Sequence, residues 1–153
     1  MSQSIDTSIL ALVGQRTERQ TEVVTRRDIR KYSVATAQRL KRFIDGDEAP
    51  PLFHLALFWP IVPIEQLAAD GCAIDAMFPQ IPGRRPMAGG LKVEYHQPIH
   101  PGDVLTATRT LSNIYEKQAT SGTLVFVEVE TTVVDARGQL VLKDKNKIGR
   151  AHV

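Results

Sequence analysis

The segment PPLFHLALFW, from Pro50 to Trp59, is an almost continuous apolar run, and the fold assignment depends on how it is interpreted. Proline suits the first turn of a helix, where its missing N–H leaves no hydrogen bond unmade. Leu and Ala dominate the run and no β-branched residue precedes Ile61, so the composition favours a helix. A helix that is apolar on every side belongs in a protein interior. The sequence therefore predicts a buried helix that begins near Pro51 and is limited by Pro60 and Pro63.

Upstream of this run, the sequence predicts a second, amphipathic helix. Thr25 followed by Asp28 has the form of a capping box, and apolar residues then recur at steps of three and four as far as about Phe43. Acids, a glycine and paired prolines in residues 45–51 then indicate a turn.

Downstream of a loop at residues 79–86, the periodicity changes from helical to two, which is typical of half-buried strands. Turns at 98–103, 121–122 and 136–138 separate four predicted antiparallel strands: Leu91–His96, Val104–Tyr115, Leu124–Val134 and Gln139–Ile148. Helices followed by strands indicate an α+β fold with a sheet around the apolar helix. We expect one domain over residues 1–153.

Composition excludes several classes of protein. Apolar residues make up 42% and charged residues 24%, and the net charge of +2 is too small to indicate a nucleic-acid partner. No apolar run is long enough to cross a membrane, and no secretory signal is recognisable. The single cysteine, Cys72, excludes an internal disulfide, so we expect a cytoplasmic protein. Basic clusters at 26–31, 39–42 and 143–150 are solvated faces or contacts for a phosphate-bearing ligand such as coenzyme A.

Several motifs, in their order and spacing, resemble the MaoC-like hotdog hydratases over roughly residues 20–150. The resemblance is greatest to the N-terminal hotdog half of mesaconyl-C4-CoA hydratases and of mitochondrial 3-hydroxyacyl-thioester dehydratases. The matching pieces are Pro50–His54, Arg84–Gly90, Tyr95–Asp103, Tyr115–Lys117 and Ser121-Gly122.

This resemblance implies a hotdog fold in which long strands wrap a central helix and an acyl thioester lies in a tunnel between paired domains. In the two-domain relatives, the N-terminal half shapes the tunnel and the C-terminal half is catalytic. The chain is similar to the first half alone, so we expect a partner, either a second MaoC-like hotdog chain or another copy of itself. Acyl-CoA or acyl carrier protein thioesters are the expected substrates, with no further cofactor.

The MaoC-like family places its acid–base pair as an Asp followed by a His five residues later. No aspartate of the chain meets this spacing. His54, at the start of the apolar helix, is the remaining candidate. It could contact the ligand, act as a base with Asp45 or Asp47 from the adjacent turn, or be a core histidine hydrogen-bonded to backbone.

The other candidate substrate-binding residues have structural alternatives. Leu55 follows His54 in the helix, and Gly89 with Gly90 would let a thioester pass close to the backbone or would mark a bulge. Cationic side chains could contact coenzyme A phosphates or simply be solvated: Arg84, Arg85 and Lys117. The other histidines, His96, His100 and His152, lack metal-ligand spacing, so no metal site is expected.

Three hypotheses about function remain open. In the first, the chain shapes the tunnel of an enoyl-CoA hydratase or 3-hydroxyacyl-thioester dehydratase and is inactive alone, because a partner supplies the Asp-His pair. In the second, it is a self-sufficient homodimeric hydratase or thioesterase. In the third, it is a non-catalytic acyl-CoA binding module.

Overall fold

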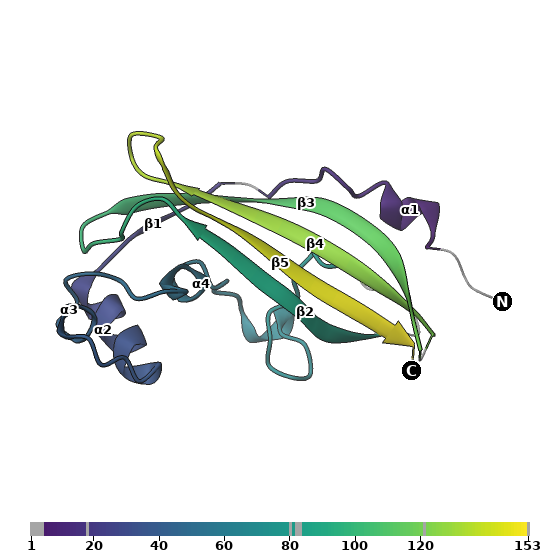
Figure 1. Ribbon diagram of the computed structural model, residues 1–153, viewed down its shortest axis with the longest axis horizontal. Coiled ribbons are helices and arrows are strands. Elements are labelled where there is room, and N and C mark those ends of the chain that lie inside the picture. The colour runs from purple at the N-terminus through teal and green to yellow at the C-terminus, as the bar shows by residue number, and fades with distance from the viewer. Residues whose placement is uncertain (1–4, 18, 80, 82–83, 121, 153) are drawn as a thin grey trace.

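One curled antiparallel sheet dominates the fold (Figure 1). The computed structural model describes residues 5–17, 19–79, 81, 84–120 and 122–152. The sheet has five strands in the order β1-β3-β4-β5-β2. Their bounds are Gln20–Val23 (β1), Arg84–Tyr95 (β2), Val104–Ala119 (β3), Gly122–Val134 (β4) and Leu140–His152 (β5). The helices α2, α3 and α4 lie below the sheet in Figure 1, toward one end of it.

Short helices accompany the sheet, which confirms the predicted α+β class. The prediction of one helix continuing to Phe43 is wrong, because α2 ends at Ala35. Their bounds are Thr7–Leu10 (α1), Arg26–Ala35 (α2), Lys41–Ile44 (α3) and Phe53–Leu57 (α4), with a 3-10 turn at Ile64–Gln66. Thr25 caps α2 as predicted, since its Oγ1 accepts a hydrogen bond from the Asp28 N–H at 3.1 Å. The chain then leaves α2 through Ala37, whose φ of 54° is incompatible with a continuing right-handed helix.

All four predicted strands are present, and each is longer than predicted. β2 begins inside the predicted loop, at Arg84, while β3 reaches Ala119 and β5 reaches His152. The short edge strand β1, which pairs with the beginning of β3, was not predicted. Gly89 and Gly90 mark a β-bulge, which was one of the two predictions for them. The β2–β5 register shifts between Ala88 and Gly90.

The apolar helix differs from the prediction that it is buried on every side. It begins at Phe53 rather than near Pro51, and only Phe53 and His54 of α4 are buried. Leu55 is 36% exposed, and beyond the helix Trp59 is 60% and Ile61 fully exposed. The sheet therefore covers one side of α4 and leaves a second apolar surface open.

Two apolar clusters fill the inner face of the sheet. One lies under α2 and α4 and includes Ile29, Phe53, Leu105, Val133 and Leu142. The other lies toward the opposite end of the sheet and consists of Met77, Phe78, Leu111, Ile114, Val125, Val127 and Val129. In the part of the chain that the structure describes, no helix is both long enough and apolar enough to cross a membrane.

Candidate functional site

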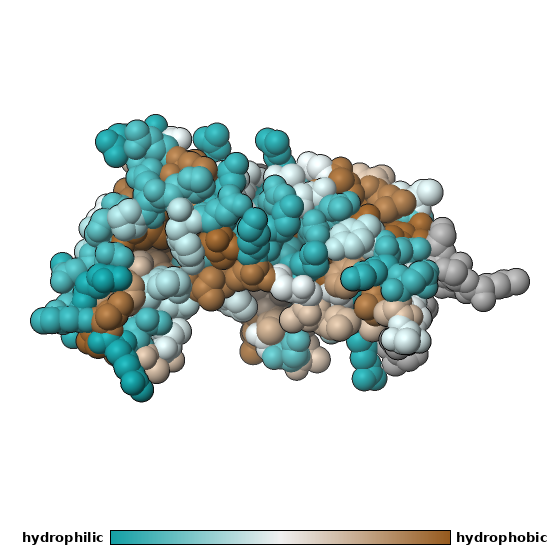
Figure 2. Space-filling model, in the orientation of Figure 1, coloured by the Kyte–Doolittle hydropathy of each residue, from teal (hydrophilic) through white to brown (hydrophobic). Residues whose placement is uncertain are grey.

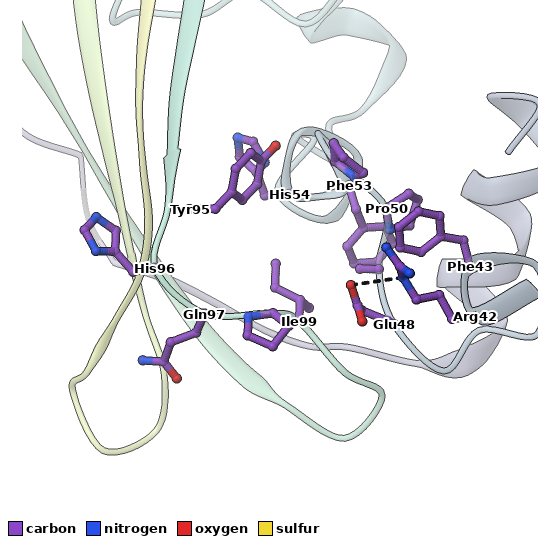
Figure 3. A pocket seen from close by; sticks show the side chains of 13 residues that line it. Arg42, Phe43, Glu48, Pro50, Phe53, His54, Tyr95, His96, Gln97 and Ile99 are labelled. Carbon is purple, nitrogen blue, oxygen red and sulfur yellow. Dashed lines mark ion pairs between the residues drawn. The ribbon is translucent and has the colours of Figure 1, made fainter. Parts of the chain in front are cut away.

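A pocket of about 370 Å³ opens where the chain enters α4. Its walls come from the turn before α4, from the first residues of α4 and from the end of β2 with the segment after it (Figure 3). The lining residues are Arg42, Phe43, Glu48–Pro51, Phe53, His54 and Tyr95–Ile99. Phe53 and Ile99 belong to the core beneath, so the pocket has an apolar floor and a polar rim. Such a mixture is typical of small-molecule sites.

The turn at the entrance to α4 is held by a tyrosine from the sheet. Leu52 has a φ of 66°, a left-handed conformation that is unfavourable for a leucine. The Leu52 N–H donates a hydrogen bond of 2.9 Å to the Tyr95 hydroxyl oxygen. Because that oxygen is the acceptor, the Tyr95 O–H proton remains able to donate to another group. Burial raises the pKa of the nearby Tyr32 hydroxyl, and the electrostatic interaction with Tyr95 raises it further.

One of the lining residues of the pocket, His54, belongs to a buried histidine–carboxylate pair. His54 Nε2 of α4 lies 2.9 Å from Asp144 Oδ2 of β5. The two side chains are only 2% and 3% exposed. The other polar atom of each group, His54 Nδ1 and Asp144 Oδ1, is buried without a hydrogen-bond partner among the described residues. Each unsatisfied buried polar atom costs about 1–3 kcal/mol, which makes this pair a poor choice for stability alone.

The carboxylate that meets His54 is not one of the two that the sequence suggested. Asp45 forms an ion pair with Lys41, and Asp47 forms one with Arg26. Both carboxylates are at the surface, 40% and 57% exposed respectively. The histidine also differs from a core histidine bonded to backbone, since its partner is a carboxylate.

Sequence reasoning missed Asp144 because it tested only the short Asp-to-His spacing. The sequence did contain a signal for Asp144, because Leu142 and Asp144 are two residues apart in a predicted strand and so point to the same face of the sheet. Leu142 is fully buried, so a carboxylate two residues later is directed into the same interior. An acidic residue on the inward face of a half-buried strand is uncommon and indicates a partner in the core.

The remaining candidate residues do not line this pocket. Gly90 lines a second groove of about 460 Å³ farther along β2 and β5. At Gly89, an added Cβ would lie 2.8 Å from the Lys147 backbone oxygen, so the close approach there is to β5. Leu55 is half-exposed, and Lys117 is exposed near the end of β3, opposite Leu124.

Of the two predicted arginines, Arg85 is not among the residues that line the pocket. Arg85 is exposed on the edge strand β2, and the Arg84 side chain lies outside the described part of the structure. A different arginine stands at the rim, where Arg42 Nε lies 3.5 Å from Glu48 Oε1 (Figure 3). The arginine that lines the pocket therefore comes from α3.

Metal-binding geometry is not found among the described residues, where no three His, Cys, Asp or Glu side chains converge. In Figure 3 the His96 ring points away from His54. The polar chemistry of the pocket consequently depends on His54 with Asp144, on Tyr95, and on the Arg42–Glu48 pair at the rim.

Comparison with proteins of known sequence identifies a hydratase relative. Over 81 residues, the chain is 37% identical to mesaconyl-C(4)-CoA hydratase of Chloroflexus aurantiacus. That alignment covers 52% of this chain and 29% of the relative, so the chain matches less than a third of that protein's length.

Solved structures show the same fold at low sequence identity. A hot-dog-like protein from Thermanaerovibrio acidaminovorans superposes with a TM-score of 0.56 and 18% identity, covering 97% of this chain and 90% of that one. The HadBC (3R-hydroxyacyl-ACP dehydratase) complex of Mycobacterium tuberculosis superposes with a TM-score of 0.55 and 15% identity, covering 90% of this chain and 96% of that one. These likenesses confirm the hotdog fold that the sequence motifs implied.

The family assignment rests on a longer stretch of the chain than the 81-residue alignment to the hydratase relative. Residues 11–144, from the segment after α1 to Asp144 itself, match the family described as the FAS1-like, dehydratase domain region. That span includes both residues of the buried pair, the whole pocket and the beginning of β5. The chain therefore belongs to the FAS1-like dehydratase domain family of MaoC-like hotdog proteins.

Proposed function

We propose that the chain is the acyl-thioester-binding unit of an enoyl-thioester hydratase or 3-hydroxyacyl-thioester dehydratase. The observation that carries the proposal is the pocket at the start of α4, which has an apolar floor and polar groups at its edge. Its volume of about 370 Å³ lies within the range of small-ligand sites. A short acyl group would occupy the apolar floor, and the thioester carbonyl would lie near Tyr95.

The charge around the pocket suits a phosphate-bearing carrier. Arg42 lines the rim, and α2, which packs against α3, carries Arg26, Arg27, Arg30 and Lys31. Figure 2 shows hydrophilic side chains over this end of the molecule. Coenzyme A and the phosphopantetheine arm of acyl carrier protein both present phosphate to such a surface.

In the first form of the proposal, a second hotdog chain supplies the Asp-His pair, as the sequence resemblance implies. The absence of that spacing from this chain supports this form. So does the likeness to HadBC, which is described as a complex. The second form is a self-sufficient hydratase, and the buried His54–Asp144 pair favours it specifically.

Binding of crotonyl-CoA to the purified chain tests the common part of both forms. We expect Arg42→Gln to weaken binding about tenfold, equivalent to ~1.4 kcal/mol, because one charged contact to phosphate is lost. Arg137→Gln is the matched control, since Arg137 lies in the exposed turn between β4 and β5. Isothermal titration calorimetry would measure both variants. No binding by the wild type, or equal binding by both variants, would contradict the proposal.

Hydration of the same compound separates the two forms. The enoyl absorbance is followed for the chain alone and after addition of a hotdog protein that carries the Asp-to-His spacing. Activity only in the mixture would support the first form, and activity of the chain alone would support the second. If neither sample hydrates crotonyl-CoA although it binds, the chain is a binding module.

A further inference from the structure

The pair of His54 and Asp144 is separated from the other charged groups around the pocket. The three acids in the turn before α4 each have a basic partner, namely Lys41 for Asp45, Arg26 for Asp47 and Arg42 for Glu48. Among the described residues, no lysine or arginine forms an ion pair with Asp144. Its contact is the imidazole of His54.

The surroundings of Asp144 would suit a hydrocarbon side chain. Asp144 is opposite Val93 of β2 and Thr131 of β4, and it follows the fully buried Leu142 on the same face. Burial of a carboxylate in such a setting is unfavourable unless the charge is compensated. The pair is therefore costly for folding, and groups of this kind concentrate at functional sites.

We propose that His54 and Asp144 are the acid–base pair of this chain and replace the absent short-spaced Asp and His of related hydratases. This inference rests on the proposed function, in its self-sufficient form. His54 Nε2 lies 2.9 Å from Asp144 Oδ2. In the assigned tautomer, Nε2–H donates to this carboxylate oxygen and the lone pair is on Nδ1. Nδ1 is then the basic atom, and no described residue competes for it.

The reaction assigned to this pair balances without a cofactor. His54 Nδ1 removes a proton from water while the water oxygen forms a bond to C3 of the enoyl thioester. The C2=C3 π bond breaks, and its electron pair moves toward the thioester oxygen, where the Tyr95 O–H can donate a hydrogen bond. Nδ1–H then returns the proton to C2, so water has been added across the double bond and His54 is regenerated.

Within this scheme, His54 is the catalytic residue and Asp144 is a positioning residue. The carboxylate holds the imidazole in one tautomer and stabilises the imidazolium that forms between the two proton transfers. Loss of either function should lower kcat, whereas substrate binding depends on the pocket walls and on Arg42.

The test compares the wild type with His54→Gln and Asp144→Asn, using crotonyl-CoA, mesaconyl-CoA and a 2-octenoyl-CoA. We expect His54→Gln to lower kcat at least about 100-fold, the usual contribution of a positioned acid–base group. Asp144→Asn should lower kcat about 10-fold or more with KM within about twofold, since it affects proton transfer but not binding. His100→Gln is the control, because His100 is exposed in the turn before β3.

Folding and binding are measured on the same samples, so that a damaged core is recognised. Circular dichroism should match the wild type in all three variants. The calorimetric Kd for crotonyl-CoA should match it in Asp144→Asn and His100→Gln, because neither residue lines the pocket. Wild-type hydration with unchanged kcat in His54→Gln would overturn the inference but leave the proposed function intact. Binding without hydration by the wild type would also overturn it, whereas no binding of any of the three thioesters would overturn the proposed function.

Discussion

At the scale of single residues, the His54–Asp144 contact should be visible in stability as well as in catalysis. Both side chains are almost fully buried, so truncation of one leaves the other unpaired in the core. We expect Asp144→Ala to lower the free energy of unfolding by about 3 kcal/mol. His54→Ala should have a similar effect, and the double variant should lose at least ~1 kcal/mol less than the sum of the two. Urea denaturation measures all three.

Asp45→Ala is the matched control for that cycle. Asp45 is 40% exposed and pairs with Lys41 at the surface, so its removal should change the free energy of unfolding by less than about 1 kcal/mol. Strict additivity of the two buried truncations would show that the imidazole and the carboxylate do not interact in solution.

The same pair marks the limit of what the sequence could predict about the site. His54 could be singled out because it interrupts an apolar run at a predicted helix start. Its partner is distant in the chain, 90 residues away, and reaches it only through the register of β5 against β2 and β4. A search for a local spacing cannot find a contact that the sheet creates. Asp45 and Asp47 are near in sequence, but Lys41 and Arg26 hold them at the surface.

At the scale of elements, the end of α2 offers a test of backbone strain. The Ala37 N–H donates to the Val34 carbonyl at 3.1 Å and the Gln38 N–H to the Ser33 carbonyl at 2.9 Å, which is a Schellman ending. Glycine suits the left-handed residue of this motif, whereas Ala37 adopts it at a φ of 54°. We expect Ala37→Gly to raise the free energy of unfolding by about 1 kcal/mol.

The identical substitution two residues earlier provides the control. Ala35 is the last residue of α2 and is exposed like Ala37, but it has helical geometry. Ala35→Gly should therefore lower the free energy of unfolding, by roughly 0.5–1 kcal/mol. Thermal or urea unfolding measures the two variants together. Equal destabilisation by both would mean that the left-handed turn carries no strain.

These elements also show which parts of the fold could be predicted from the sequence. The Thr25 cap and the alternating strands follow from local chemistry, and both were predicted. The end of α2 was not predicted, because Ala37 is a good helix former by composition and yet adopts a left-handed conformation. The strand β1 was missed since its four residues are too few for periodicity to be recognised.

At the scale of the whole molecule, the strand order leaves β2 as a long edge of the sheet. Its twelve residues include Met87, Leu91 and Tyr95, which are 45%, 38% and 50% exposed. An unpaired edge with apolar side chains is prone to pair with another strand. Two further large apolar side chains are exposed just after α4, Trp59 and Ile61.

We therefore expect the purified chain to self-associate through β2, giving a particle of twice its 17.0 kDa mass in sedimentation velocity experiments. Leu91→Lys places a charge in the centre of that edge and should shift the protein to monomer, because charge on an edge strand opposes pairing. Val34→Lys, on the exposed face of α2, is the control and should leave the mass unchanged. If the wild-type chain stays monomeric at all concentrations, we expect β2 to pair with a different hotdog chain. Such a result would favour the two-chain form of the proposed enzyme over the self-sufficient one.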